Sequence, residues 1–576
     1  MKKAASTIGH AAFLCKKVFF PTAPCGKLEE SNGLEWKPVK RIFYNGTVYT
    51  GQFPLAEAFA VEGERFVFAG SSHDALALSG EGDELCDLGG RFVCAGFNDS
   101  HMHLLNYGRV LNSPRLDLHT GSLEEMLRCL REFPAAGEGW LVGRGWNQDY
   151  FTDVSRMPNR WDLDRVSTGR PVCAVRACGH ALAVNSRGLE VLGITADTSQ
   201  PEGGEIVLEN GVPNGVFLDN AMDLVYRSIP APGKEELKEM IRAACAALNA
   251  YGVTSVQSDD YCVFPNLPWQ AVNEAYRELE AAGELTVRVY EQCNFADLKE
   301  FAGFVEAGNR TGMGSSRFRI GPLKMLGDGA LGPRTAFLSR PYADDPTACG
   351  IPVFTQETFD EMLTYARAHG MQSAVHAIGD ACLDRVLNAL EKARQTCPGE
   401  DLRDGIVHCQ ITRPDQLERI AALGLHVYAQ SIFLDYDTRI VRSRVGEELA
   451  STSYAWDTLR KRGVTVSNGT DCPVELPFAL GGIQCAVTRT DLAGSGEPYL
   501  PEEAFTVQEA LDSYTAAGAY ASFEEGEKGK ILPGMLADFV ILEQNPFSVE
   551  PGVIGEIAVC AAYVGGEAVY SAERTG

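Results

Sequence analysis

The sequence predicts an α/β protein in which eight strands and their helical crossovers close into a barrel, with a small sheet domain built from both ends of the chain. Two observations predict this fold. Apolar strand-like segments alternate with helical segments through the middle of the chain, which is typical of a parallel sheet. Short β-rich segments, broken by Asn-Gly and Gly-Glu turns, lie on both sides of that region.

The middle region holds the eight predicted strands. The first is the strand that approaches His101 from RFVCAGF (91–97), and the other seven are VTSVQS (253–258), LTVRVYE (285–291), RIGPLKML (319–326), QSAVHA (372–377), DGIVHC (404–409), LHVYAQ (425–430) and GVTVSNGTD (463–471). Helices predicted at 234–252, 358–370 and 414–424 fit between them. About 150 residues separate the first strand from the second, which is too long for a loop. We therefore expect an inserted subdomain at about 112–230.

Four regions follow from this pattern. Residues 1–38 form an N-terminal extension, and residues 93–528 form the barrel with its insertion. Residues 39–92 and 529–576 are expected to build one discontinuous sheet domain, because chain termini often lie close together.

Composition excludes some classes of partner. With 51 Lys and Arg against 77 Asp and Glu, the net charge of −26 repels phosphate backbones and anionic lipid, so neither nucleic acid nor a membrane surface is an expected partner. A small-molecule substrate and a homodimer are the expected partners.

The cysteines and the N-terminal residues predict a cytoplasmic protein. The 17 cysteines form no CxxC pair and are read as reduced thiols. Lys16 and Lys17 interrupt any signal-peptide core, and no run approaches the ~18 apolar residues of a membrane span.

The stretch GFNDSHMHLLNYG (96–108) carries the first chemical signal. His101 and His103 are two residues apart at the end of a strand, so their side chains point to the same side. Barrel enzymes place their sites at the carboxyl ends of the strands. The pair is therefore suited to form half of a metal site. Two ordinary polar residues at a strand end are the alternative when the pair is taken alone.

Three further strand ends strengthen the metal interpretation. His376 ends one strand in VHAIGD, His408 ends the next in IVHCQ, and Asp471 ends another in VSNGTD. Imidazole and carboxylate are suitable ligands for zinc. Because barrel strands end at one face, the sequence predicts a divalent metal site with one or two ions there, with zinc as the expected metal.

The segment GDGALG (327–332) fits the GxGxxG pattern of dinucleotide-binding proteins. That fingerprint needs a helix to begin at the glycines, whereas PRTAFLSRPYADDP follows, with prolines at 333 and 341. We therefore predict a tight loop beside the site and no nucleotide cofactor.

Several motifs together resemble a known family. GFNDSHMH is similar to the metal-binding opening of the amidohydrolase superfamily, and GPLKMLGDGALGPRTAFLSRPYADDP, HAIGD, IVHCQ and SNGTDCPVE resemble its YtcJ-like branch, amidohydrolase family 3, which includes N-substituted formamide deformylase. The resemblance covers about residues 40–572. It implies a distorted TIM (β/α)8 barrel, a small β-sandwich made by both chain ends and an inserted α+β subdomain.

The resemblance also implies roles for the metal-site residues. His101 and His103 would hold the more buried metal, and His376 and His408 the second. Lys324 would bridge the two as a carboxylated lysine, because an unmodified lysine would place a positive charge among metal ions. A one-metal site with a different role for Lys324 is the alternative. Asp471 would bind metal and take a proton from the attacking water.

Candidate substrate contacts come from two places. In the insertion, GRGWNQDYF (143–151) and ACGHALAVNS (177–186) resemble family elements that line the substrate pocket. The resemblance implies that Trp146 is an apolar wall and that His180 is a catalytic donor to the substrate oxyanion. Asp328 and Arg334 of the glycine-rich loop are further substrate-binding candidates. Core packing is the alternative for Trp146, and a loop-fixing salt bridge is the alternative for Arg334.

The expected activity is metal-dependent hydrolysis of a carbon–nitrogen bond other than a peptide bond, through a metal-activated water. Two alternatives stay open. One is a deaminase or isomerase on the same metal site, since one fold hosts several chemistries. The other is a non-catalytic metal-binding regulatory protein.

Overall fold

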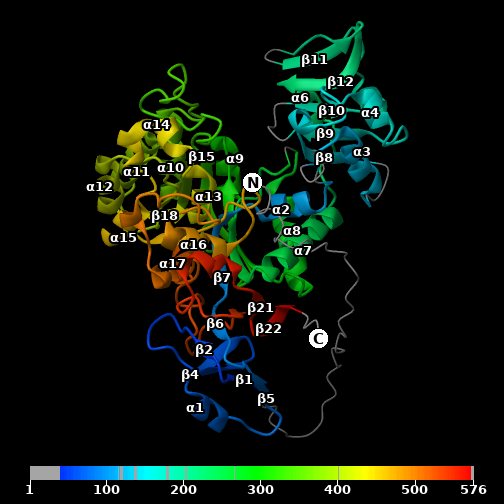
Figure 1. The fold of residues 1–576 in the computed structure, drawn as a ribbon. Coiled ribbons are helices and arrows are strands. Elements are labelled where there is room, and N and C mark those ends of the chain that lie inside the picture. Colours follow the sequence, from blue (N-terminus) through cyan, green and yellow to red (C-terminus); the bar gives the residue numbers. More distant parts are fainter. Residues whose placement is uncertain are drawn as a thin grey trace. The chain divides into compact units, whose positions relative to one another are not determined.

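The central sheet of the protein contains eight parallel strands (Figure 1). The computed structural model describes residues 39–114, 116, 121–134, 139–176, 181–201, 204–264, 266–399 and 401–572, so the extension predicted at 1–38 lies outside the described residues. The strands are β7 (Phe97–Met102), β13 (Val253–Ser258), β14 (Arg288–Asn294), β15 (Phe318–Leu326), β16 (Ser373–Ala377), β17 (Gly405–His408), β18 (His426–Ala429) and β19 (Val466–Asn468). They pair in chain order from β7 to β19, which confirms the predicted α/β barrel.

The two outer strands of this sheet meet at a seam just beyond β19. The Asp471 N–H donates to the carbonyl of His101 at 2.8 Å, and the Thr470 N–H donates to Asp99 Oδ1 at 2.9 Å. The Thr470 hydroxyl also donates to Asp99. Gly469 lies so close to β7 that an added Cβ would be 2.5 Å from the His101 nitrogen. The sheet is thus nearly closed into a barrel by backbone contacts between the ends of β7 and β19.

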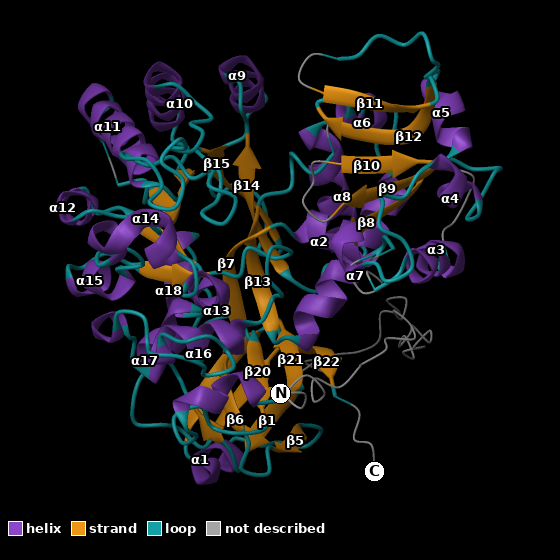
Figure 2. Ribbon diagram, turned by 45° about the horizontal axis from the view of Figure 1, so that its top comes forward, coloured by secondary structure: helices purple, strands orange, loops and turns teal. Residues whose placement is uncertain are grey.

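Helices follow the strands and flank the sheet (Figure 2). Three of them overlap the predicted ranges: α7 (Lys234–Ala250), α10 (Gln356–Ala368) and α12 (Pro414–Ala422). The others around the sheet include α8 (Trp269–Ala281), α9 (Leu298–Glu306), α11 (Asp380–Thr396), α15 (Trp456–Lys461) and α16 (Ala479–Thr488). In α7, Leu237, Ile241 and Leu248 recur on one face and are all buried, which is the spacing of an amphipathic helix.

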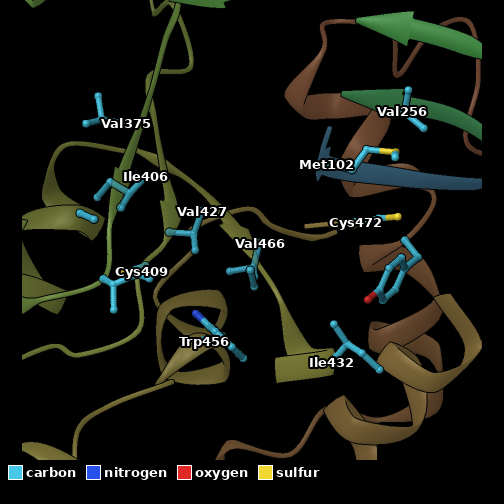
Figure 3. Close-up of a cluster of buried hydrophobic side chains, with 14 of the residues drawn as sticks. Met102, Val256, Val375, Ile406, Cys409, Val427, Ile432, Trp456, Val466 and Cys472 are labelled. Carbon is cyan, nitrogen blue, oxygen red and sulfur yellow. The ribbon is translucent and has the colours of Figure 1, made fainter. Parts of the chain in front are cut away.

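One large hydrophobic cluster joins the strands to these helices. Met102, Val256, Val375, Val427 and Val466 come from five different strands and are almost fully buried. Figure 3 shows them with Trp456 of α15 and Ile432, which follows β18. Strands β13, β16 and β17 of this sheet are buried along their whole length, which explains their near-continuous apolar sequences.

The two ends of the chain share a sheet. Strands β2 (Thr47–Val48) and β6 (Phe92–Ala95), blue in Figure 1, continue into β20 (Phe539–Leu542), β21 (Val559–Val564) and β22 (Glu567–Ser571), drawn in red tones. A second sheet has the order β4-β3-β1-β5, with the bounds β1 (Lys40–Tyr44), β3 (Ala58–Glu62), β4 (Arg65–Gly70) and β5 (Glu84–Asp87).

Aromatic side chains join these two sheets. Phe43 stacks on Phe59 with ring centroids 4.7 Å apart, and both meet the edge of the Phe539 ring. A shared apolar cluster between the sheets therefore links residues from both chain ends.

A buried ion pair fixes the C-terminal strands to the barrel. Arg288 of β14 donates through Nε and Nη2 to the two oxygens of Asp538, at 2.6 and 2.9 Å. The Gly565 N–H donates to the same carboxylate at 2.7 Å. Burial opposes ionisation, but the charge of Arg288 holds the pKa of Asp538 below its usual range.

Replacing Asp538 with Ala is expected to cost about 3–5 kcal/mol of stability, because it leaves the Arg288 guanidinium buried without its partner. Urea unfolding followed by circular dichroism measures the loss. The exposed pair Arg340–Glu448 provides the control, and Glu448→Ala should shift the midpoint little. An Asp538→Ala midpoint equal to that of the Glu448→Ala protein would contradict the role of the ion pair.

The long segment between β7 and β13, predicted as an inserted subdomain, carries a sheet of its own. Its sheet has the order β11-β12-β10-β9-β8, where β8 is Leu141–Trp146, β9 Val172–Arg176, β10 Ala181–Val184, β11 Gly204–Glu209 and β12 Val212–Asp219. Helices α3 (Leu123–Glu132), α4 (Arg160–Asp164), α5 (Ser186–Leu192) and α6 (Met222–Tyr226) accompany it. Two separate apolar clusters contain alternate residues of β9, because successive strand side chains point to opposite faces.

The glycine-rich loop after β15 has no helix. The next helix, α10, begins only at Gln356, which agrees with the reading of GDGALG as a loop. None of the helices in the described ranges has the length and hydropathy needed to cross a bilayer. Every cysteine within those ranges is a free thiol.

Candidate metal centre

The carboxyl ends of β7 and β19 bring three potential metal ligands together. His101, His103 and Asp471 each offer one ligand atom, and these atoms lie within 4.8 Å of one another. Asp471 Oδ1 is 3.1 Å from His103 Nε2 and 3.5 Å from His101 Nε2. His101 is fully buried, whereas about a quarter of the His103 side chain is exposed. The centre thus has a closed inner side and an open outer side.

Hydrogen bonds fix which nitrogen of each imidazole faces this centre. His101 Nδ1 donates to Gln292 Oε1 at 2.7 Å, and His103 Nδ1 donates to the carbonyl oxygen of Asp259 at 3.0 Å. Because both partners are oxygens that only accept, the proton of each ring sits on Nδ1. Nε2 of each ring therefore faces Asp471 and is the nitrogen available to a metal. That of His103 shares a proton with Asp471 at 3.1 Å, and a bound cation would take the place of this proton.

The histidines of β16 and β17 lie beside this group. The His408 ring centroid is 5.5 Å from that of His101 and 4.4 Å from that of His376. His408 Nδ1 donates to Gln430 Oε1 at 2.7 Å, again leaving Nε2 as the ligand atom. His376 is held differently: its Nε2 lies 3.2 Å from Asp328 Oδ1 and 3.2 Å from the Gly329 carbonyl, which leaves Nδ1 for a metal.

Lys324 is fully buried in β15. Its ammonium lies 3.4 Å from Asp259 Oδ2, and that carboxylate also accepts from Asn294 Nδ2 at 2.9 Å. The backbone carbonyl of the same Asp259 holds His103. Lys324 is thus connected to His103 through one residue, Asp259, and a buried cation in this position depends on that residue for its charge balance.

Two of the predicted ligands have unusual backbone conformations. His408 has φ 74° and Asp471 has φ 57°, both in the left-handed region that non-glycine residues seldom adopt. Such conformations cost roughly 1–3 kcal/mol each and persist where the surroundings enforce them. Here they turn the chain at the ends of β17 and β19.

Burial sets the protonation of the imidazoles. It holds the pKa of His101 and His408 well below the usual range, assisted by the positive charge of Lys324. Burial would also lower the pKa of His103, but its hydrogen bond to Asp471 and the charge of Asp259 raise that pKa to about 9. Burial raises the pKa of Asp99, which lies behind Asp471, to about 7. The two inner rings are therefore neutral and able to bind a cation.

The donor set fits a divalent metal. Two imidazole nitrogens and one carboxylate converge, and each imidazole is oriented by a hydrogen bond on its other nitrogen. Residues His101, His103 and Asp471 would hold an ion directly, with His376, His408 and Lys324 beside them.

The predicted substrate contacts have different surroundings. The Asp328 carboxylate accepts hydrogen bonds from the N–H groups of Phe337, Ile378 and Gly379, and its Oδ1 lies 3.2 Å from His376 Nε2. This makes Asp328 a support for His376. Arg334 forms a two-pronged ion pair with Asp344, which is the salt-bridge alternative considered for it.

Neither candidate of the insertion, Trp146 or His180, is placed at the metal centre by the described residues. Trp146 is fully buried in the apolar cluster of the inserted subdomain, as its packing alternative predicts, and its Nε1 has no hydrogen-bond partner there. His180 falls in 177–180, outside the described residues.

Three residues that orient the ligands were missed by sequence reasoning. Gln292, Gln430 and Asp259 each support a histidine. The signal that located the histidines also marks them, because Gln430 ends the predicted strand LHVYAQ, Asp259 follows VTSVQS, and Gln292 follows LTVRVYE. Each of the three is a polar residue at the end of an apolar predicted strand or directly after it, so the same pattern could have identified them.

Comparisons with known proteins agree with this site. Residues 84–570 match the family described as "Amidohydrolase family". YtcJ of Bacillus subtilis (strain 168) is 33% identical over 548 residues, which cover 92% of this chain and 99% of YtcJ. N-substituted formamide deformylase of Arthrobacter pascens is 26% identical over 535 residues, which cover 90% and 96% of the two chains. The crystal structure of an uncharacterized metal-dependent hydrolase from Pyrococcus furiosus matches with a TM-score of 0.74 at 30% identity, covering 88% of this chain and 100% of that one.

The matches extend over almost the full length of these relatives, so they include the barrel, its insertion and the sheets from both chain ends. The family, the fold and the converging ligands lead to the same conclusion. This chain belongs to the amidohydrolase family and is a metal-dependent hydrolase of the amidohydrolase superfamily.

Proposed function

We propose that this protein hydrolyses a carbon–nitrogen bond of the amide type, other than a peptide bond, in a small molecule. The observation that carries the proposal is the position of Asp471, whose Oδ1 lies 3.1 Å from His103 Nε2 and 3.5 Å from His101 Nε2. A carboxylate in this position can both bind a metal and exchange a proton with a water beside it. The similarity to N-substituted formamide deformylase supports an amide-type substrate.

A bound divalent metal, zinc in our proposal, would lower the pKa of water toward ~7 and polarise the substrate carbonyl. His101, His103 and Asp471 would hold one ion, and His376 and His408 a second, with a carboxylated Lys324 between them. Asp471 accepts the proton of the attacking water and delivers it to the leaving nitrogen, so that the amide and water become a carboxylic acid and an amine. His180 donates to the oxyanion of the tetrahedral intermediate.

The same site could support a deaminase, which releases ammonia in place of a larger amine. The partial exposure of the ligand set argues against a non-catalytic metal site. A structural metal is enclosed on all sides, whereas about a quarter of the His103 side chain is exposed. We expect the reaction to take place in the cytoplasm, where scattered thiols stay reduced.

The test is a substrate panel with zinc-loaded protein. N-substituted formamides, other secondary amides, aminated heterocycles and esters are incubated with the enzyme, and amine, ammonia and acid are measured separately. Release of a substituted amine together with its acid supports the proposal. Ammonia from the aminated compounds alone would replace it with a deaminase, and no turnover of any compound would favour the regulatory alternative.

A further inference from the structure

Two buried glutamines stand behind the metal-site histidines in the same way. Gln292 of β14 accepts from His101 Nδ1, and Gln430, just beyond β18, accepts from His408 Nδ1, each at 2.7 Å. Both glutamines are fully buried. The chain therefore uses one type of uncharged side chain twice to hold imidazoles that come from different strands.

The orientation of each amide is determined by its second hydrogen bond. Gln292 Nε2 donates to the Ser100 carbonyl at 3.2 Å, and Gln430 Nε2 donates to the Tyr428 carbonyl at 2.9 Å. A backbone carbonyl only accepts, so the amide nitrogen must face it and the amide oxygen must face the histidine. A flipped amide would place oxygen against oxygen on one side and lose the imidazole bond on the other.

We propose that Gln292 and Gln430 are positioning residues that hold His101 and His408 in the Nδ1–H tautomer, so that Nε2 of each ring faces the metal centre. The proposal rests on the same metal centre as the proposed hydrolysis, but on no assumption about the substrate. The two glutamines do not bind the metal themselves, but we expect them to determine how tightly the centre binds it.

The chemical reason is the charge of the partner. A carboxylate behind a histidine draws its proton and makes the ligand more basic, whereas a neutral oxygen orients the ring without adding negative charge. His101, His103 and His408 all have neutral oxygens behind them, from two amides and one backbone carbonyl. His376 alone among the four has a carboxylate, that of Asp328. A centre supplied with neutral partners stays more electrophilic, which favours activation of water.

The experiment measures zinc affinity without substrate. Gln292→Met and Gln430→Met keep the length and flexibility of the side chain but remove the acceptor. Each variant is expected to bind zinc 10–100-fold more weakly in competition with a chromophoric chelator, which is the usual cost of losing an outer partner. Gln292→Glu restores an oxygen for the Nδ1 proton and should recover most of the affinity that Gln292→Met loses.

Gln257→Met is the matched control. Gln257 is also a fully buried glutamine of the barrel, in β13, but its Nε2 donates to the Gly518 carbonyl. The zinc affinity of the Gln257→Met variant should equal that of the wild-type protein. Thermal melting of the metal-free variants separates loss of folding from loss of affinity.

Two results would overturn the proposal. One is unchanged zinc affinity in folded Gln292→Met and Gln430→Met proteins. The other is an equal loss in Gln257→Met, which would attribute the effect to the removal of any buried amide. An unchanged protein that binds zinc tightly but turns over nothing in the substrate panel would reject the proposed function and leave this proposal standing.

Discussion

Asp471→Asn is expected to reduce the turnover number by roughly 10²–10⁴-fold while the protein stays folded. The asparagine amide cannot accept the proton of the attacking water, so no group at position 471 can transfer this proton to the leaving nitrogen. Asparagine is a suitable replacement because residue 471 has φ 57°, and Asn, like Asp, adopts the left-handed region more readily than most residues. The substitution therefore tests chemistry with little change in backbone strain. Steady-state kinetics on the best substrate of the panel, with metal content measured in parallel, provides the result.

Asp219→Asn is the matched control for this prediction. Asp219 also has a left-handed backbone, with φ 47°, but it is an exposed residue of the inserted subdomain. Its substitution should leave both turnover and metal content unchanged. A turnover number for Asp471→Asn equal to that of the Asp219→Asn protein, at full metal occupancy, would remove Asp471 from the proton-transfer step.

Lys324→Met is expected to remove metal as well as activity. Protein prepared with bicarbonate and without chelator should contain about two divalent ions per chain, the stoichiometry of carboxylate-bridged hydrolytic centres. Without the bridging group the second ion should be lost, and hydrolysis should fall by no less than the roughly 10–100-fold typical of outer partners. Methionine preserves most of the buried volume of this fully enclosed lysine. Plasma mass spectrometry measures the metal directly.

Lys528→Met controls for the loss of a buried lysine. The Lys528 ammonium is held by Ser255 and Glu524 and has almost no exposed surface. Its replacement should leave metal content unchanged even if stability falls. If the unchanged protein contained about one ion per chain and Lys324→Met contained the same amount, the centre would be mononuclear. The ion pair with Asp259 would then be the whole role of Lys324.

Alternating strand and helix segments were sufficient to predict the barrel, because a parallel strand buried on both faces has a near-continuous apolar sequence. The ends of the strands were less predictable. The strand expected at 285–291 is β14, Arg288–Asn294, and its first residue is paired with Asp538, which is 250 positions away. The strand expected at 463–471 pairs only over Val466–Asn468, because the chain leaves the ladder to place Asp471 in its left-handed conformation. Both boundaries depend on contacts that local sequence does not contain.

The candidate site was also predictable only in part: the sequence identified its ligands but not their orientation. The positions of His101, His103 and Asp471 at strand ends predicted that they would converge, and the structure brings their ligand atoms within 4.8 Å. The sequence could not show which ring nitrogen faces the centre, because that depends on partners such as Gln292, 191 positions from His101. Asp328 was predicted to contact substrate, but the structure surrounds its carboxylate with backbone N–H groups and His376. A short motif identifies the residue types at a site, whereas their orientation is determined by the rest of the fold.

The seam between β7 and β19 has a consequence for how the protein matures. Thr470 and Asp99, which hold the seam together, are 371 positions apart, and the ligands on either side of it are nearly as distant. No partial chain that ends before β19 contains the complete centre, so tight metal uptake can begin only after the last barrel strand has been synthesised and docked. Any ion that then spans the seam binds only the closed form and stabilises it by mass action. Hydrogen exchange of the Asp471 amide, which bonds to the His101 carbonyl, should therefore slow when zinc is added, and should report completion of the barrel.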